Sequence, residues 1–179
     1  MSPGVNDFLR ATLHGGPAIA LTSARLRNPG SGDPGLVARR IDGASARTLP
    51  GLFEAYAWAW DFPGYFGGNK DAFNDCMTDL DDGRFSPAGG TATTGFLTVV
   101  TRAEQFLADA PPADRAWFAQ SQAGYRDDYR TVNAYGADRP VPLQFGVVLH
   151  TDLSHLRTVT DRWRAAGASP AVLITNGKD

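Results

Sequence analysis

The 179-residue sequence contains a single cysteine and no long apolar stretch. Cys76 cannot form an internal disulfide, so the sequence gives no sign of a secreted, disulfide-stapled domain, and a reducing compartment is expected. No apolar run approaches the roughly 18 residues that a membrane-spanning helix needs. Residues 1–16 lack the basic start and apolar core of a signal peptide. We therefore expect a soluble, cytoplasmic protein that has no membrane partner.

A glycine motif of P-loop spacing is also absent, and the charge pattern argues against nucleic acid as a ligand. Residues 54–82 carry seven acids and one base, Lys70, for a net charge of −6. The rest of the chain carries 12 acids and 16 bases, for a net charge of +4. A surface that binds nucleic acid is basic, whereas a locally negative surface attracts a cationic partner. The alternative interpretation is a solvated acidic face without a ligand.

Strand-like and helix-like patterns alternate along the sequence. Strands are expected at residues 36–41, 96–100, 143–149 and 171–175. Helices are expected at about residues 5–13, 48–60, 69–80, 102–108, 113–129 and 153–166. This alternation predicts an α/β fold, in which a small, mostly parallel sheet of three to four strands is flanked by helices.

One main domain accounts for most of the chain. Glycine, proline, serine and aspartate cluster at residues 28–35, as is typical of a loop. Residues 1–34, with a short apolar run at 18–21, are therefore interpreted as an N-terminal extension and linker. Residues 35–150 form the main domain. Residues 151–179 form a C-terminal helix and strand that we expect to pack on the same sheet.

The first two helices of the main domain have clear apolar faces. Residues 57–60 (AWAW) belong to an apolar helix face, which predicts a core role rather than a platform for stacking bases. Asn69 is a good N-cap for the next helix. The buried side of that helix is predicted to consist of Phe73, Cys76, Met77 and Leu80.

The opposite side of this helix is acidic. Asp71, Asp75 and Asp79 are four residues apart and line up along one stripe, next to Asn74 and Thr78. Like charges at this spacing cost roughly 0.2 to 0.5 kcal/mol for each pair. Asp71 alone gains from the helix dipole, because that benefit fades after the first turn. Asp75 and Asp79 therefore indicate a partner outside the chain.

The loop before this helix places two aromatic residues among glycines. Tyr65 and Phe66 lie between Gly64 and the pair Gly67 and Gly68, where few neighbouring side chains can bury them. Glycine also lets a backbone approach a partner closely. We expect either that both rings are exposed or that Phe66 anchors the loop in the core with Tyr65 half-buried.

Residues 62–80 (FPGYFGGNKDAFNDCMTDL) resemble the signature of the barstar family. That signature is a Pro-x-Tyr-Tyr-Gly-x-Asn loop followed by a helix that reads x-Asp-Ala-x-x-Asp-Cys-Leu. Eight positions of this chain match it: Pro63, Tyr65, Gly67, Asn69, Asp71, Ala72, Asp75 and Cys76. A looser resemblance covers about residues 35–150.

The resemblance implies an inhibitor that blocks the active site of a guanine-specific microbial ribonuclease in a 1:1 complex, as a monomer and without a cofactor, a metal or enzymatic activity. Asp75 matches the main acid, which occupies the phosphate site of the enzyme, and Asp71 matches a second acid. Tyr65 matches the aromatic residue that packs over the catalytic histidine. The predicted partner-binding residues are Tyr65, Gly67, Asn69, Asp71, Asn74, Asp75, Thr78 and Asp79.

The sequence also departs from the family pattern. Asn74 stands where a tryptophan is frequent, and Leu80 stands where another contact aromatic occurs. These departures leave open an immunity protein that neutralises a different class of toxin through the same surface. Asp127 and Asp128 are weak candidates for a further contact acid.

An enzyme is disfavoured by the placement of the residues that could carry chemistry. His150, Asp152 and His155 could be imagined as a metal site, but a strand should end at His150 and His155 belongs to the next helix. Asp71, Asp75 and Asp79 could be imagined to hold Mg²⁺, but carboxylates spaced along one helix face do not by themselves wrap a cation, which argues against such a site. Cys76 lies on an apolar face and is expected to be a core residue.

Overall fold

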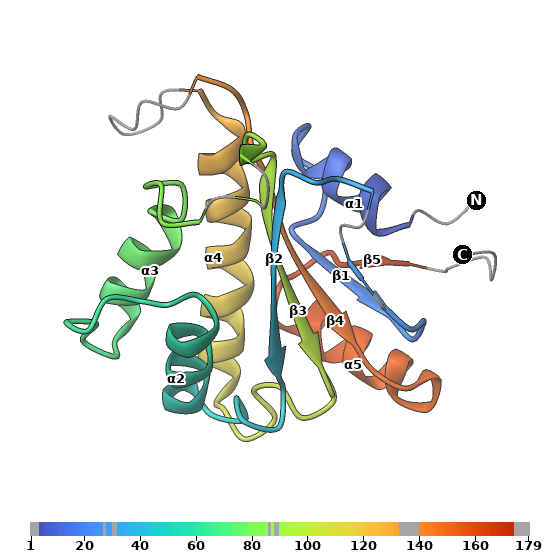
Figure 1. The fold of residues 1–179 in the computed structure, drawn as a ribbon. Helices are drawn as coiled ribbons and strands as arrows, with labels where there is room; N and C mark the ends of the chain where they lie inside the picture. Colours follow the sequence, from blue (N-terminus) through green and yellow to red (C-terminus); the bar gives the residue numbers. More distant parts are fainter. Residues whose placement is uncertain are drawn as a thin grey trace.

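The computed structural model describes residues 4–26, 28–29, 32–85, 87, 90–132 and 140–173. Its centre is an all-parallel sheet of five strands in the order β2-β3-β4-β1-β5 (Figure 1). The strands are β1 (Ile19–Thr22), β2 (Leu36–Asp42), β3 (Gly95–Thr101), β4 (Gln144–His150) and β5 (Ala171–Val172). The helices are α1 (Val5–Thr12), α2 (Leu49–Ala59), α3 (Lys70–Thr78), α4 (Pro112–Arg130) and α5 (Leu153–Ala165). The predicted α/β class is confirmed.

The sheet has five strands, whereas the sequence predicts three to four. The additional strand is β1, which comes from the apolar run at residues 18–21 within the segment interpreted as an N-terminal extension. All four residues of β1 are buried, and the strand pairs with β4 on one side and with β5 on the other. The run of four residues is too short for its own sequence pattern to predict a strand. Its pairing with β4 and β5, which are distant in the sequence, makes it one.

Helices pack on both faces of the sheet. Successive residues of β4 alternate between two core clusters, with Val147 and Leu149 in the larger cluster and Val148 in the smaller one. The larger cluster contains side chains of α2, α3, α4 and α5, and the smaller one contains Phe8 of α1. The ring of Phe8 lies so close to Gly146 that a Cβ atom there would be 2.7 Å from it. A glycine inside β4 is therefore required by α1.

The segment from Arg102 to Ala108, predicted to be a helix, is a series of turns instead. Arg102 and Leu107 adopt left-handed backbone conformations, with φ of 50° and 52°, which a helix cannot contain. The amide of Leu107 donates to the carbonyl of Ala46 at 2.8 Å rather than to a helical acceptor. This prediction was wrong because contacts with the loop before α2 decide the backbone here.

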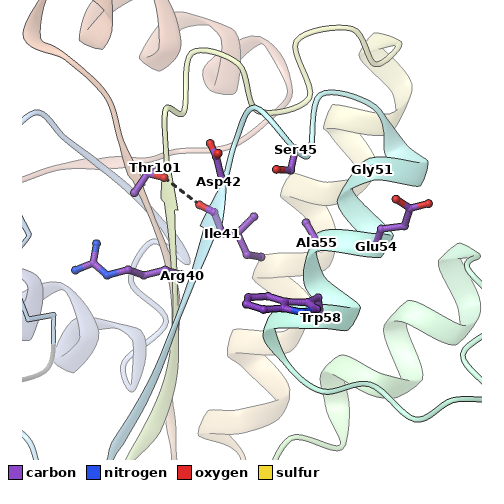
Figure 2. Close-up of a pocket in the computed structure, with 9 residues that line it drawn as sticks. All are labelled: Arg40, Ile41, Asp42, Ser45, Gly51, Glu54, Ala55, Trp58 and Thr101. Atoms are coloured by element: carbon purple, nitrogen blue, oxygen red, sulfur yellow. Dashed lines mark hydrogen bonds between the residues drawn. The ribbon is translucent and has the colours of Figure 1, made fainter.

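The two tryptophans of the AWAW segment lie in opposite environments. Trp60 is buried, and its indole N–H donates to Thr98 Oγ1 at 3.1 Å. Trp58 is 87% exposed and projects from α2 beside β2, where it lines a hollow with Ile41 and Ala55 (Figure 2). The prediction of a core role is therefore confirmed for Trp60 and wrong for Trp58.

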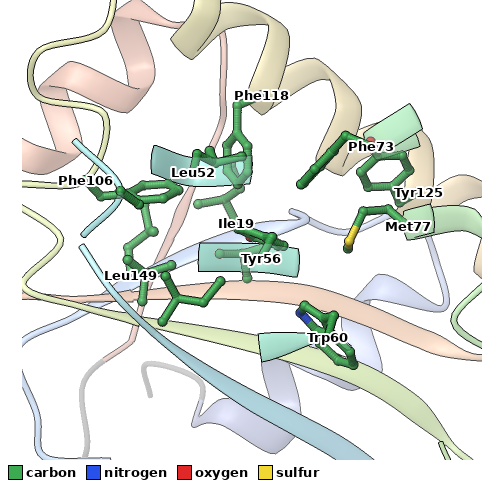
Figure 3. Packing of buried hydrophobic residues seen from close by; sticks show 14 of the residues in the cluster. Ile19, Leu52, Tyr56, Trp60, Phe73, Met77, Phe106, Phe118, Tyr125 and Leu149 are labelled. Carbon is green, nitrogen blue, oxygen red and sulfur yellow. The ribbon is translucent and has the colours of Figure 1, made fainter. Parts of the chain in front are cut away.

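The core around α2 and α3 is mainly aromatic (Figure 3). The ring of Phe73 lies 5.1 Å from that of Tyr56 and 5.6 Å from that of Trp117, measured between centroids. Both contacts are edge-to-face, an arrangement that adds roughly 0.5 to 1.5 kcal/mol for each pair beyond burial. Phe73 therefore fixes α3 between α2 and α4.

No helix among the described residues is long and apolar enough to cross a membrane.

Candidate functional site

The buried side of α3 agrees with the sequence prediction. Phe73, Met77 and Leu80 are fully buried, and Cys76 is 8% exposed. The hydroxyl group of Tyr129 on α4 donates to the carbonyl of Met77 at 2.7 Å and accepts from the amide of Leu80 at 3.0 Å. This buried hydroxyl holds the C-terminal end of α3 against α4.

The start of α3 is fixed by the predicted cap. Asn69 Oδ1 accepts from the amide of Ala72 at 2.9 Å, so this side chain is engaged in the helix terminus. The preceding Gly68 has φ of +61°, a conformation that suits glycine. The cap and the glycine together set the direction in which α3 leaves the loop, and so the direction in which its acidic face points.

Lys70, the base among the acids of residues 54–82, is turned towards α4. Its ammonium group lies 2.8 Å from Asp114 Oδ1 and 5.1 Å from the centroid of the Trp117 ring. An ion pair and a cation–π contact therefore hold the charge of Lys70 at the α3–α4 junction. The acids on the outer face of α3 keep their negative charge uncompensated by this residue.

Asp71 and Asp75 are exposed on that outer face. Within the described parts of the chain, neither carboxylate forms an ion pair. Asp79 lies at the C-cap, just beyond the helix. Partial burial raises the pKa of Asp79 above its ordinary value, and nearby Asp82, Asp81 and Asp75 raise it further. The three carboxylates thus form a concentrated negative surface.

Like Asn69, two further predicted site residues form hydrogen bonds inside the protein. Asn74 is half-buried, and its side-chain oxygen accepts from the hydroxyl group of Tyr125 on α4. Burial raises the pKa of Tyr125, so this hydroxyl stays protonated and remains a donor. Thr78 Oγ1 donates to the carbonyls of Asn74 and Asp75 at 3.1 Å and 3.0 Å. The side chains of Asn74 and Thr78 thus hold α3 in place through hydrogen bonds within the protein.

The glycine-rich loop separates its two aromatic residues. Phe66 is half-buried, and its ring centroid lies 5.1 Å from that of Phe62 and 6.1 Å from that of Phe53. Tyr65 is 88% exposed, as one of the two alternatives from the sequence expects, and the other alternative, a half-buried Tyr65, was wrong. Phe66 anchors the loop, while Tyr65 projects into solvent beside Gly67, which is also exposed.

Tyr65 and the acids surround one hollow of about 370 Å³. Its lining residues are Pro63, Tyr65, Phe66, Ala72, Asp75, Cys76, Asp79, Asp82 and Arg84. The hollow thus combines apolar side chains with three carboxylates, which suits a cationic side chain that has an apolar stem. Burial raises the pKa of the Cys76 thiol, so this lining residue is a neutral thiol at neutral pH.

The participation of Asp82 and Arg84 in this hollow was not predicted from the sequence. Asp82 contributes to the charge of residues 54–82, but it follows the helix and has no place in its periodic pattern. A turn at Gly83, with φ of +90°, brings Arg84 back to the hollow. Asp-Gly is a turn signal, yet it does not say where the residue after the turn points.

Asp127, His150 and His155, which the sequence also offered as candidates, do not line this hollow. Asp127 is paired with Arg126 and Arg130, at 2.9 Å and 2.7 Å, which lowers its pKa. His150 ends β4 and is half-buried, whereas His155 is exposed on α5. In the described ranges, no three or more His, Cys, Asp or Glu side chains are grouped as a metal site requires.

The hollow beside Trp58 differs in its chemistry. It has a volume of about 610 Å³, and its acids include Asp42, which forms a two-point ion pair with Arg102 that lowers its pKa. Arg40 points away from Trp58 in this view (Figure 2). The Trp58 hollow therefore lacks the row of uncompensated carboxylates that distinguishes α3.

A family model described as Barstar (barnase inhibitor) matches residues 36–145, which is more than half of the chain. The matched range runs from β2 into β4 and contains α2, α3 and α4 with all of the predicted partner-binding residues. No curated protein matches the chain. β1, α5 and β5 lie outside the matched range.

Proposed function

The chain belongs to the barstar family, and on this premise we propose that it inhibits a guanine-specific microbial ribonuclease by covering the active site of the enzyme with α3 and the loop before it. Members of the family are inhibitors rather than enzymes. The observation that carries the proposal is the exposure of Asp71 and Asp75 on α3, where Asp75 lines the same hollow as the exposed ring of Tyr65. Lys70 is held at α4 and does not neutralise these acids.

The mechanism is occupation of a phosphate site by carboxylates. A ribonuclease cleft holds arginine, lysine and histidine side chains that bind the phosphate groups of RNA. Carboxylates on a fixed helix offer these cations acceptors in place of phosphate, and charge-assisted hydrogen bonds to arginine are strong and frequently bidentate. In our proposal Asp75 enters the phosphate site, Asp71 adds a second contact, and Tyr65 covers the catalytic histidine. RNA is excluded without any chemical step.

The acidic face is fixed before binding, which favours tight association. α3 is capped by Asn69, packed through Phe73 and bonded to Tyr129, so little order has to be gained in the complex. Binding surfaces that are already ordered lose less conformational entropy on association. We further propose that the protein acts in the cytoplasm, as a monomer in a 1:1 complex.

A second candidate is an immunity protein that neutralises a different class of toxin through the same surface. It is favoured by the absence of two contact aromatics of the family. Asn74 is bonded to Tyr125, and Leu80 is buried, so neither can present a ring to a partner. A panel of ribonucleases and of other purified toxins, assayed for inhibition, separates the two candidates.

The direct test is titration of a guanine-specific ribonuclease such as barnase with the purified protein. We expect RNA cleavage to fall linearly with added protein and to stop at one equivalent. A Tyr65→Ala, Asp75→Ala double variant should inhibit far less at the same concentration. Full RNA cleavage at a large excess of the wild-type protein, for every guanine-specific ribonuclease in the panel, would contradict the proposal.

Association with the enzyme is expected to slow strongly as salt is added. Between about 0.01 and 0.15 M ionic strength the screening length falls from about 30 Å to about 8 Å, which weakens the attraction between the acids of α3 and the cationic cleft. The association rate constant should fall about tenfold or more, while the dissociation rate constant changes little. Stopped-flow fluorescence measures both. Association that is insensitive to salt would indicate an apolar interface instead.

Two equally exposed aromatic residues provide a matched pair of variants. Tyr65→Ala should weaken binding by about 2 kcal/mol, or roughly 30-fold in Kd, because Tyr65 lies beside the acids. Trp58→Ala should change Kd by less than about twofold, because Trp58 lines the separate hollow between α2 and β2. Isothermal titration calorimetry gives both constants. An equal loss in the two variants would place the interface elsewhere.

A further inference from the structure

Arg84 is a basic residue within an otherwise acidic hollow. It lines the hollow together with Asp75, Asp79 and Asp82. Its Nε atom lies 2.6 Å from Asp82 Oδ2, and its backbone amide donates to Asp82 Oδ1 at 3.0 Å. One carboxylate therefore fixes both the backbone and the guanidinium of Arg84, so its charge is held at the rim of the hollow.

The charge of Arg84 acts on the acids around it. Arg84 lowers the pKa of Asp79, opposing the rise caused by burial and by the neighbouring carboxylates. It also opposes the rise that burial causes in the pKa of Cys76, which lines the hollow. The side chain is 34% exposed, and its guanidinium carbon lies 5.8 Å from the centroid of the Phe85 ring. Arg84 is thus a built-in counter-ion for this end of the acidic surface.

A counter-ion in this place affects any cationic partner. A side chain that enters the hollow to reach Asp75 or Asp79 meets the like charge of Arg84, and repulsion between like charges opposes binding. Such a repulsive element separates partners that tolerate it from partners that do not. Arg157 on α5 is also an exposed cation, but it does not line the hollow.

We propose that Arg84 is a specificity residue that competes with the cationic side chains of a ribonuclease for the carboxylates around the hollow and so lowers affinity for cationic clefts. The proposal rests on ribonuclease inhibition as the function. Only an enzyme whose cations bind the carboxylates more strongly than Arg84 does is inhibited well. Arg84 itself makes no favourable contact with such a cleft in this scheme.

The test compares Arg84→Gln with Arg157→Gln, which removes the same charge from α5, a helix on the other side of the sheet's centre from α3 (Figure 1). The probe is catalytically inactivated barnase, studied by stopped-flow fluorescence and calorimetry at low and high salt. Arg84→Gln should raise the association rate constant and lower Kd, each by about fivefold at low salt, with a smaller gain at high salt. Arg157→Gln should stay within about twofold of the wild type.

A second measurement uses the free protein. In an NMR titration of the aspartate side chains, Arg84→Gln should raise the pKa of Asp79, because a counter-charge is lost, whereas Arg157→Gln should leave it unchanged. If the wild type binds barnase and Arg84→Gln binds equally or more weakly, the role of Arg84 is overturned and the inhibitory function stands. If neither form binds any guanine-specific ribonuclease, the inhibitory function itself is wrong, and the role of Arg84 falls with it. An unchanged pKa of Asp79 would also overturn the role of Arg84.

Discussion

Replacement of Asp75 by alanine is expected to weaken ribonuclease binding by roughly 4 kcal/mol or more, which is about a thousandfold in Kd. The magnitude corresponds to the strongest residues found by alanine scanning of protein interfaces, where the main acid of barstar itself, at about 7.7 kcal/mol, lies at the upper end. Asp75 is central to the proposed contact because it is exposed, unpaired and part of the hollow that Tyr65 borders. Its loss leaves a cation of the enzyme buried without a partner, which is costlier than the loss of an exposed ion pair.

The fold should not suffer from this change. Asp75 is exposed and makes no side-chain contact on which α3 depends, so the free energy of unfolding should stay within about 0.5 kcal/mol. Any change should be a slight gain in stability, because Asp71 and Asp79 lie four residues away on either side and repel Asp75. Urea unfolding checks stability, and calorimetry or stopped-flow fluorescence checks binding.

Asp161→Ala on α5 is the matched control for Asp75→Ala. Asp161 is also an exposed helical carboxylate, with a side chain that is 60% exposed, but it lies outside the acidic surface of α3. Asp161→Ala should leave Kd within about twofold of the wild type. Asp75→Asn separates charge from size and should lose most of the affinity as well. A Kd unchanged by Asp75→Ala would remove the acid from the interface.

Replacement of Tyr129 by phenylalanine is expected to destabilise the protein by about 2 to 4 kcal/mol. The buried hydroxyl group donates to the carbonyl of Met77 and accepts from the amide of Leu80. Without the hydroxyl group, the buried carbonyl of Met77 and the buried amide of Leu80 both lose this hydrogen-bond partner. Each buried polar group left without a partner costs roughly 1 to 3 kcal/mol of stability. The ring itself stays, so its stacking on Phe145, with centroids 5.3 Å apart, is retained.

Urea unfolding measures this effect as a lower midpoint with an unchanged slope. Tyr65→Phe is the control, because it removes a hydroxyl from a side chain that is 88% exposed, and it should shift the free energy of unfolding by less than about 0.5 kcal/mol. A loss below about 1 kcal/mol in Tyr129→Phe would mean that the end of α3 does not depend on this contact with α4.

The sequence predicted α3 well because local rules determine it. Asn69 caps the helix, and the apolar residues Phe73, Cys76, Met77 and Leu80 repeat at helical spacing. The opposite side of the helix was therefore predicted to face solvent. Exposure of Asp71 and Asp75 follows from that geometry. The partner for Lys70 does not follow from it, because Asp114 lies 44 residues further along the chain.

Features that depend on distant parts of the chain escaped prediction. Asn74 was expected on the outer surface, but Tyr125, 51 residues away, provides a donor that engages its side chain. The turns at residues 102–108 depend on a bond from Leu107 to the loop before α2. Arg84 reaches the hollow through a turn whose direction the sequence does not reveal. In each case a tertiary contact outweighs the local pattern.

The position of β1 ties the two ends of the chain together. The hydroxyl group of Thr22, the last residue of β1, donates to the carbonyl of Leu173, which lies 151 residues further along the chain. In the sheet, β1 lies between β4 and β5. Pairings between residues so far apart close a very large loop and slow folding, because the entropy of closure is lost before the contact is gained. During synthesis β2 and β3 can pair early, whereas β1 must wait for its two neighbours in the sheet until β4 (Gln144–His150) and β5 (Ala171–Val172) have left the ribosome.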